Sequence, residues 1–257
     1  MAPLRALLLL LALARGSPGQ TPSLTCGQVP GALAQIDAGN GQVFGVDAAG
    51  GVFAVYNDSL LQIHGNFSHV TVGAAGVWGV NKTGHVFKMV GGEWIRTSGS
   101  LHQIDSSGAQ LLTGVNWKKE YFCLDSKAAM AVKDDANLSW VKHMGNMNYF
   151  SCGPLGCWGV SDDVWFQYPS TPQSCNGAKW AMVSGKLTEI EVGSDGSVYG
   201  VNRDGELLQR VGINTSSPTG THWKQLTFQS EKFRHVTYDL DQLWLITIEN
   251  KILKCIN

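Results

Sequence analysis

Five aromatic residues recur along the chain, each placed directly before a Gly-Val pair or, in the last copy, before a Leu-Ile pair. They are Phe44, Trp78, Trp158, Tyr199 and Trp244. Aromatic rings at repeated positions can stack on the apolar face of a sugar. They can equally pack between neighbouring sheets, which need bulky residues at equivalent positions. The series therefore supports two interpretations, a sugar-stacking role and a packing role.

Polar residues accompany the same repeat. Those that follow the pair are Asp47, Asn81, Asn116, Ser161 and Asn202. Such residues can contact a ligand, but Asn and Asp also start hairpin turns by hydrogen-bonding their own backbone. The acidic residues Asp37, Asp105 and Glu191 stand at predicted strand starts. They are harder to explain by structure alone, because acidic residues are depleted in strands. The candidate carbohydrate-binding set is Asp37, Phe44, Trp78, Asn81, Asp105, Trp158, Glu191, Tyr199 and Asn202.

Signatures of catalysis and metal binding are absent from the sequence. It contains no GxSxG, HExxH or P-loop motif, and its seven histidines do not fall at ligand spacings. The adjacent acids Asp162 and Asp163 would point apart on an extended chain, unlike the paired carboxylates of a glycosidase. We therefore expect no enzymatic activity, no cofactor and no bound metal.

Charge and composition narrow the possible partners. The 257 residues carry a formal net charge of -1, and no basic excess exists to neutralise the phosphates of a nucleic acid. There is no polybasic run for an anionic membrane surface. The 31 glycines, nine tryptophans and 15% charged residues are typical of short strands joined by tight turns.

The Gly-Val pair marks an internal repeat that organises the chain. Its glycines stand at 45, 79, 114, 159 and 200, and Leu245 continues the series. By subtraction the spacings are 34, 35, 45, 41 and 45 residues, which is the range of one four-stranded propeller blade. Each copy contains four strand-like runs, so we expect an all-β, six-bladed β-propeller.

The two ends of the chain complete the sixth blade. The last copy, residues 233–257, supplies three strands and lacks the fourth. Residues 24–33 align with the fourth strand of the second copy at a constant offset of 68, which places Cys26 at the position of Trp94. We therefore expect the N-terminal strand to close the ring beside the last strand, and Cys26 to form a disulfide with Cys255.

The other cysteines and the N-terminus indicate export. Residues 1–19 are predicted to be a cleaved signal peptide, because the apolar run at 6–14 is too short to span a membrane. Residues 20–257 would then form the secreted propeller, in a compartment that favours disulfides. We expect Cys152 to pair with Cys157 within one hairpin, which leaves Cys123 with Cys175. Five sequons offer N-glycosylation sites, at Asn57, Asn66, Asn81, Asn137 and Asn214.

Two segments carry a family resemblance: EIEVGSDGSVYGVNRDGELLQR at 189–210 and SCGPLGCWGVSDD at 151–163. With the repeated blade unit they resemble tectonin-repeat propeller lectins, the group of fish-egg lectins and tachylectins, over residues 24–257. The resemblance implies a six-bladed, non-enzymatic protein that binds glycans of microbial or egg surfaces. Two copies depart from the unit: LTGV at 112–115 lacks the aromatic residue, and LI replaces GV in the last. A sugar pocket built on those positions would be missing there.

Repetition also ranks the functional hypotheses. A lectin for innate defence needs several similar weak sites, whereas an enzyme needs one unique cluster, so the recurring polar and aromatic residues favour the lectin. A secreted propeller scaffold that binds another protein is the alternative, because repetition alone also builds plain structure. The sequence leaves the identity of the sugar and the formation of a homo-oligomer open.

Overall fold

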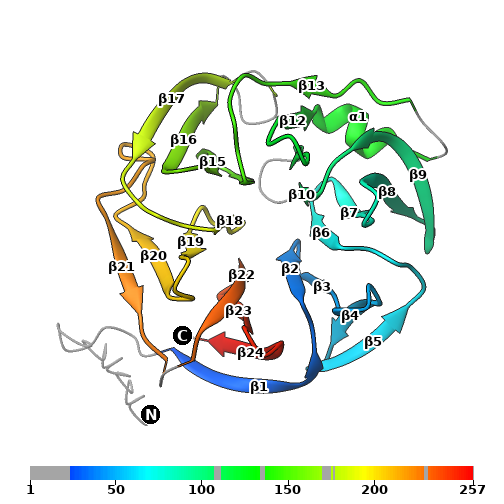
Figure 1. The fold of residues 1–257 in the computed structure, drawn as a ribbon, viewed down its shortest axis with the longest axis horizontal. Coiled ribbons are helices and arrows are strands. Elements are labelled where there is room, and N and C mark those ends of the chain that lie inside the picture. The colour runs from blue at the N-terminus through cyan, green and yellow to red at the C-terminus, as the bar shows by residue number, and fades with distance from the viewer. Residues whose placement is uncertain are drawn as a thin grey trace, which may run out of the picture.

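The chain folds as a ring of six four-stranded antiparallel sheets (Figure 1). This computed structural model describes residues 24–106, 111–133, 137–169, 175, 177–228 and 231–256. The expected all-β, six-bladed β-propeller is confirmed. The predicted signal peptide lies outside the described residues.

Each sheet is one blade, and its first strand lies nearest the centre of the ring. Blade 1 contains β2 (Gln35–Gly39), β3 (Gln42–Val46), β4 (Val52–Tyr56) and β5 (Ser59–Ile63). Blade 2 contains β6 (His69–Gly73), β7 (Gly76–Val80), β8 (His85–Val90) and β9 (Glu93–Ser100). Blade 3 contains β10 (Gln103–Asp105), β11 (Leu112–Val115), β12 (Tyr121–Leu124), the helix α1 (Ser126–Ala131) and β13 (Val141–Lys142).

The second half of the ring repeats this arrangement. Blade 4 contains β14 (Tyr149–Gly153), β15 (Gly156–Val160), β16 (Val164–Pro169) and β17 (Gly177–Val183). Blade 5 contains β18 (Glu189–Val192), β19 (Val198–Val201), β20 (Leu207–Val211) and β21 (His222–Leu226). Blade 6 contains β22 (Phe233–Asp239), β23 (Gln242–Thr247), β24 (Lys251–Ile256) and β1 (Thr25–Ala32).

Alternating strand directions give the ring two unlike faces. Face A carries the turns that join first to second strands and third to fourth strands. Face B carries the turns that join second to third strands, together with the connections between blades. Two insertions that the repeat lacks, residues 125–133 with α1 and residues 212–221, lie on face A.

The glycine of the Gly-Val pair is explained by a close approach. A Cβ atom on Gly45 would lie 2.6 Å from Leu33 Cδ1 and 2.8 Å from the Gln35 carbonyl oxygen. A Cβ on Gly200 would meet Leu187 and the Glu189 carbonyl in the same way, at 2.5 and 2.9 Å. In blades 1, 3 and 5 a leucine that enters the blade thus packs on the bare backbone of the second strand, and Phe67 and Met147 take its place in blades 2 and 4. The glycine and a large apolar residue recur together for this reason.

The N-terminal strand closes the ring as expected. Strand β1 pairs with β24 in antiparallel register, with Cys26 opposite Cys255, and a disulfide joins the two across 229 residues of sequence. The pairing removes the open edge that three strands would leave. The other two disulfides also match the expectation: Cys152–Cys157 crosses the β14–β15 hairpin, and Cys123–Cys175 links blades 3 and 4.

Candidate functional site

The acidic candidates Asp37, Asp105 and Glu191 lie on the innermost strands β2, β10 and β18, and all three are buried. Side chains on these strands bind the backbone of the next innermost strand around the ring. In each of the following pairs a side-chain oxygen of the first residue accepts a hydrogen bond from the backbone N–H of the second: Asp37–Val72 (2.6 Å), Thr71–Ser106 (2.8 Å), Asp105–Cys152 (2.8 Å), Ser151–Val192 (3.0 Å) and Thr237–Ala38 (3.0 Å). Two of the acidic candidates, Asp37 and Asp105, therefore join neighbouring blades.

A second position on the innermost strands carries one group of residues in blades 1, 3 and 5 and another group in blades 2, 4 and 6. In blades 1, 3 and 5 it consists of Gln35, Gln103 and Glu189, which bind backbone groups of the next blade. In blades 2, 4 and 6 it consists of His69, Tyr149 and His235. The Tyr149 hydroxyl lies 3.1 Å from His69 Nε2 and 3.2 Å from His235 Nε2, so three alternate blades meet in one hydrogen-bonded cluster. The inner strands thus repeat with approximate threefold symmetry, and the repeating unit is two neighbouring blades.

Burial favours the neutral forms of these inner groups. It raises the pKa of Asp37 to about 7, and the nearby Asp105 carboxylate adds to this rise. Burial likewise raises the pKa values of Glu189 and Glu191 well above the usual range, and it lowers the pKa of His235 to about 3. The inner acids of this ring are therefore suited to interblade hydrogen bonding and not to holding free charge.

The raised pKa of Asp37 predicts that this carboxyl group stabilises the fold more at acid pH than at neutral pH. Its folded-state pKa lies above its unfolded value, so its contribution to stability is present at low pH and is lost as pH rises through about 7. Lowering the pH from 7 to 6 should increase the free energy of unfolding by about 1 kcal/mol through this group. Denaturant titrations of wild type and Asp37→Asn at both pH values measure this gain. The variant should lose it, whereas the control Asp204→Asn, at an exposed carboxylate with no ion pair within the described residues, should keep it. Equal pH slopes in all three proteins would refute the assignment.

The aromatic candidates are core residues in this structure. Phe44, Trp78, Trp158, Tyr199 and Trp244 are exposed by 9, 0, 2, 5 and 3%. Trp158 meets Phe166 and Trp223 edge to face, and the Trp78 indole donates to the Ala75 carbonyl at 3.0 Å. A sugar cannot stack on rings enclosed in this way, so the structure favours the packing interpretation over the stacking one.

The polar candidates after the Gly-Val pair make turns. Asn81 Oδ1 accepts the backbone N–H of Thr83 at 3.1 Å and that of His85 at 2.9 Å. Asn202 Oδ1 accepts from the N–H groups of Asp204 and Glu206 at 3.0 and 2.9 Å. Both side chains complete hairpins on face B, which is the turn role left open by the sequence.

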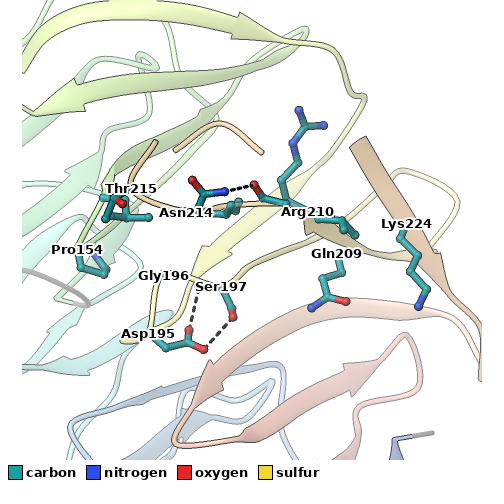
Figure 2. Close-up of a pocket in the computed structure, with 13 residues that line it drawn as sticks. Pro154, Asp195, Gly196, Ser197, Gln209, Arg210, Asn214, Thr215 and Lys224 are labelled. Atoms are coloured by element: carbon teal, nitrogen blue, oxygen red, sulfur yellow. Dashed lines mark hydrogen bonds between the residues drawn. The ribbon is translucent and has the colours of Figure 1, made fainter. Parts of the chain in front are cut away.

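A pocket that the repeat did not indicate lies on face A, between the turns of blades 4 and 5 (Figure 2). We call it the blade-5 pocket. It has a volume of about 770 Å³ and is lined by Pro154, Leu155, Asp195, Gly196, Ser197, Gln209, Arg210, Val211, Gly212, Ile213, Asn214, Thr215 and Lys224. Much of this wall comes from the insertion after β20, which has no counterpart in the repeat unit. No periodic signal could therefore have found it.

The polar groups of the blade-5 pocket are held by neighbouring atoms. Asp195 accepts from Ser197 through the backbone N–H at 2.7 Å and the hydroxyl at 2.9 Å (Figure 2). Arg210 Nε donates to the Thr219 carbonyl at 2.7 Å, and its guanidinium lies over the Trp223 ring. Gln209 Nε2 donates to the Tyr199 hydroxyl at 3.2 Å. Tyr199, a candidate from the sequence, thus does not line the pocket but hydrogen-bonds Gln209, which does.

The space between blades 2 and 3 is filled on the side of α1. The ammonium group of Lys88 lies over the Trp78 ring and donates to the carbonyls of Ala129, Met130 and Val132 at the end of α1. Lys88 is only 6% exposed. The helix insertion therefore closes the interface between blades 2 and 3.

A second pocket, of about 790 Å³, opens on face B across blades 3, 4 and 5. We call it the face-B pocket. Its lining residues are Lys119, Asn148, Ser161, Asp162, Lys186, Leu187, Thr188 and Arg203. Lys186 pairs with Asp163 at 2.9 Å, while Lys119 and Arg203 form no ion pair within the described residues. This pocket is richer in positive charge than the blade-5 pocket.

Neither a metal-binding cluster nor a membrane-spanning helix is found in the part of the chain that the structure describes. There, no cluster of three or more His, Cys, Asp or Glu residues is arranged to hold a metal ion. In the same described segments, no helix has the length and apolar character needed to cross a membrane.

Comparison with known proteins places this architecture in context. A sequence model described as the Tectonin domain matches residues 32–248. The chain is 41% identical to the Fish-egg lectin of Cyprinus carpio over 236 residues, which cover 91% of this chain and 99% of the carp protein. It is 34% identical to Tectonin-1 of Physarum polycephalum over 71 residues, 27% of this chain and 30% of that one.

Solved structures share the fold at low sequence identity. YCF48, solved bound to D1 peptide, matches with a TM-score of 0.55 and 12% identity, over 91% of this chain and 95% of its own. The Cps50 (Swd1) β-propeller domain of Myceliophteria thermophila matches with a TM-score of 0.56 and 8% identity, over 90% and 99%. At such identities the likeness shows the propeller fold alone.

Proposed function

Because the chain belongs to the tectonin family, we propose that it is a secreted lectin that binds glycans of microbial or egg surfaces in innate defence. The identity to a fish-egg lectin over nearly its whole length supports the lectin class. Three disulfides within one chain fit an oxidising compartment.

The blade-5 pocket is the observation that carries the proposal. It combines amide, hydroxyl and charged groups with the apolar surfaces of Leu155 and Ile213, as a site for a sugar's hydroxyls and C–H face requires. Lys224 is exposed and has no ion pair within the described residues, so its ammonium group is available to a ligand. We assign sugar contact to this pocket, with Tyr199 supporting Gln209 from behind.

Binding would involve more than one site on each chain. The face-B pocket is a second candidate, and the two pockets open on opposite faces of the ring. A shallow polar site of this kind should have a dissociation constant near the millimolar level, about −4 kcal/mol. Because the two pockets open on opposite faces, one chain would bridge two glycan-coated surfaces through them. The avidity gain of linked sites on a single surface, roughly 10²–10⁴, would come from additional sites on the same face. The protein would then hold and cross-link glycan-coated surfaces far better than it holds a free monosaccharide.

A paired substitution tests the pocket. Gln209→Ala with Lys224→Ala should lower glycan affinity at least tenfold, about 1.4 kcal/mol, because each lost hydrogen bond contributes roughly 0.5–1.5 kcal/mol. Titration calorimetry with the best ligand from a glycan array measures the change. Gln225→Ala is the matched control, since Gln225 neighbours Lys224 on β21 but lies outside the pocket. A folded wild-type chain that binds no glycan in any array format would favour the alternative, a scaffold for another secreted protein.

A further inference from the structure

We propose that Asn214 carries an N-linked glycan at the mouth of the blade-5 pocket, and that this glycan competes with external sugars for the pocket. The proposal rests on the proposed function, because it concerns the regulation of the same site. It would make binding by this pocket depend on how the chain itself is glycosylated.

Two independent observations coincide at Asn214. Its sequence, Asn214-Thr215-Ser216, is a glycosylation sequon, and both Asn214 and Thr215 line the blade-5 pocket (Figure 2). Asn214 is also exposed. The four other sequon asparagines, Asn57, Asn66, Asn81 and Asn137, line neither the blade-5 pocket nor the face-B pocket.

The folded turn leaves room for the modification at the amide nitrogen. Asn214 Oδ1 accepts the N–H groups of Ser216 and Ser217, both at 2.9 Å, and Nδ2 donates to the Gly212 carbonyl at 3.2 Å. An amide has two N–H groups, so Nδ2 still has one N–H to donate after the other is replaced. The two hydrogen bonds that Oδ1 accepts do not involve the nitrogen and survive glycosylation.

The covalent step is a glycosyl transfer from a lipid-pyrophosphate-linked oligosaccharide. A bond forms between Asn214 Nδ2 and C1 of the first sugar, while the bond from C1 to the pyrophosphate oxygen breaks. The lipid pyrophosphate leaves with the electron pair, and Nδ2 loses one proton. No oxidant or reductant is involved.

The surrounding insertion fixes the attachment point relative to the pocket. Asn214 and Ser217 exchange backbone hydrogen bonds at 3.1 Å in both directions. The backbone N–H of Gly220 binds the Ser217 carbonyl, and Arg210 Nε holds the Thr219 carbonyl against the blade. A glycan on Asn214 consequently starts from a constrained turn at the pocket wall.

A tethered sugar of this kind competes effectively even when its own affinity is low. Short tethers give effective concentrations on the order of millimolar. A single site with a millimolar dissociation constant would then be occupied by the chain's own glycan about half the time or more. Removing the glycan should strengthen the binding of an external sugar by roughly 2- to 10-fold.

The test uses the full chain secreted from cells that glycosylate. Ser216→Ala removes the sequon but keeps Asn214 in the pocket wall. Ser216→Thr changes the same residue but keeps the sequon, so this variant should still be glycosylated. Ser59→Ala removes the Asn57 sequon in blade 1 and is the matched control. Glycopeptide mass spectrometry reports occupancy at Asn214, and calorimetry with the best array glycan reports affinity.

We expect Asn214 to be occupied, Ser216→Ala to bind 2- to 10-fold more tightly, and Ser59→Ala and Ser216→Thr to bind as wild type does. An unoccupied Asn214, or equal affinity with and without its glycan, would overturn the proposal and leave the lectin function standing. If wild type and Ser216→Ala are both folded but bind no glycan, the proposed function fails, and the competition proposal fails with it.

Discussion

Removing the Cys26–Cys255 disulfide should lower the free energy of unfolding by about 5 kcal/mol, because the bond closes a loop across 229 residues of sequence. The chain-entropy relation predicts that a cross-link over so long a loop restricts the unfolded chain strongly. The bond also fixes β1 to β24, where the register begins near the chain end. Urea titrations of wild type and the Cys26→Ser/Cys255→Ser double variant measure the difference.

The disulfide within the β14–β15 hairpin is the matched control. Cys152 and Cys157 are separated by only 5 residues, so their loss through a double Ser variant should cost about 2 kcal/mol by the same relation. The terminal bond must therefore cost more than the hairpin bond. An equal or reversed order would show that loop entropy does not govern the stability of this ring.

The fold could be predicted from the sequence because the same physical contact recurs in five of the six blades. Leu33 packing on Gly45 is repeated by Leu187 on Gly200, so the glycine and the leucine keep step along the chain. The constant offset of 68 extends this repetition to residues 24–33 and predicts the closing strand. Cysteine pairing then follows from strand register, since Cys26 must lie opposite Cys255.

The site could not be predicted in the same way, because recurring residues do recurring structural work. Asp37 recurs as Asp105 because each binds the backbone of the next inner strand, and Asn81 recurs as Asn202 because each completes a turn. The blade-5 pocket depends on an insertion found once, at 212–221. Repeated residues indicate the contacts that the blades share, whereas this pocket is formed by a segment that is not repeated.

Trp78 is the sharpest test of packing against sugar stacking. Its ring is fully buried, and Lys88 seals it by binding three carbonyls of blade 3 across the interface. Lys254 lies over Trp244 in a similar way and binds Asp58 of blade 1 at 2.8 Å. In both cases a lysine crosses an aromatic ring to reach the neighbouring blade, so each ring belongs to an interface between blades.

Trp78→Ala should therefore lower the free energy of unfolding by about 3–5 kcal/mol, because it leaves a large cavity between blades 2 and 3. Calorimetry should show unchanged glycan stoichiometry in the variant at a temperature where it remains folded. Trp78→Phe, which keeps most of the volume and loses the bond to Ala75, should cost less than half as much. A fall in stoichiometry with little loss of stability would instead show that this ring stacks on sugar, and it would overturn the packing role.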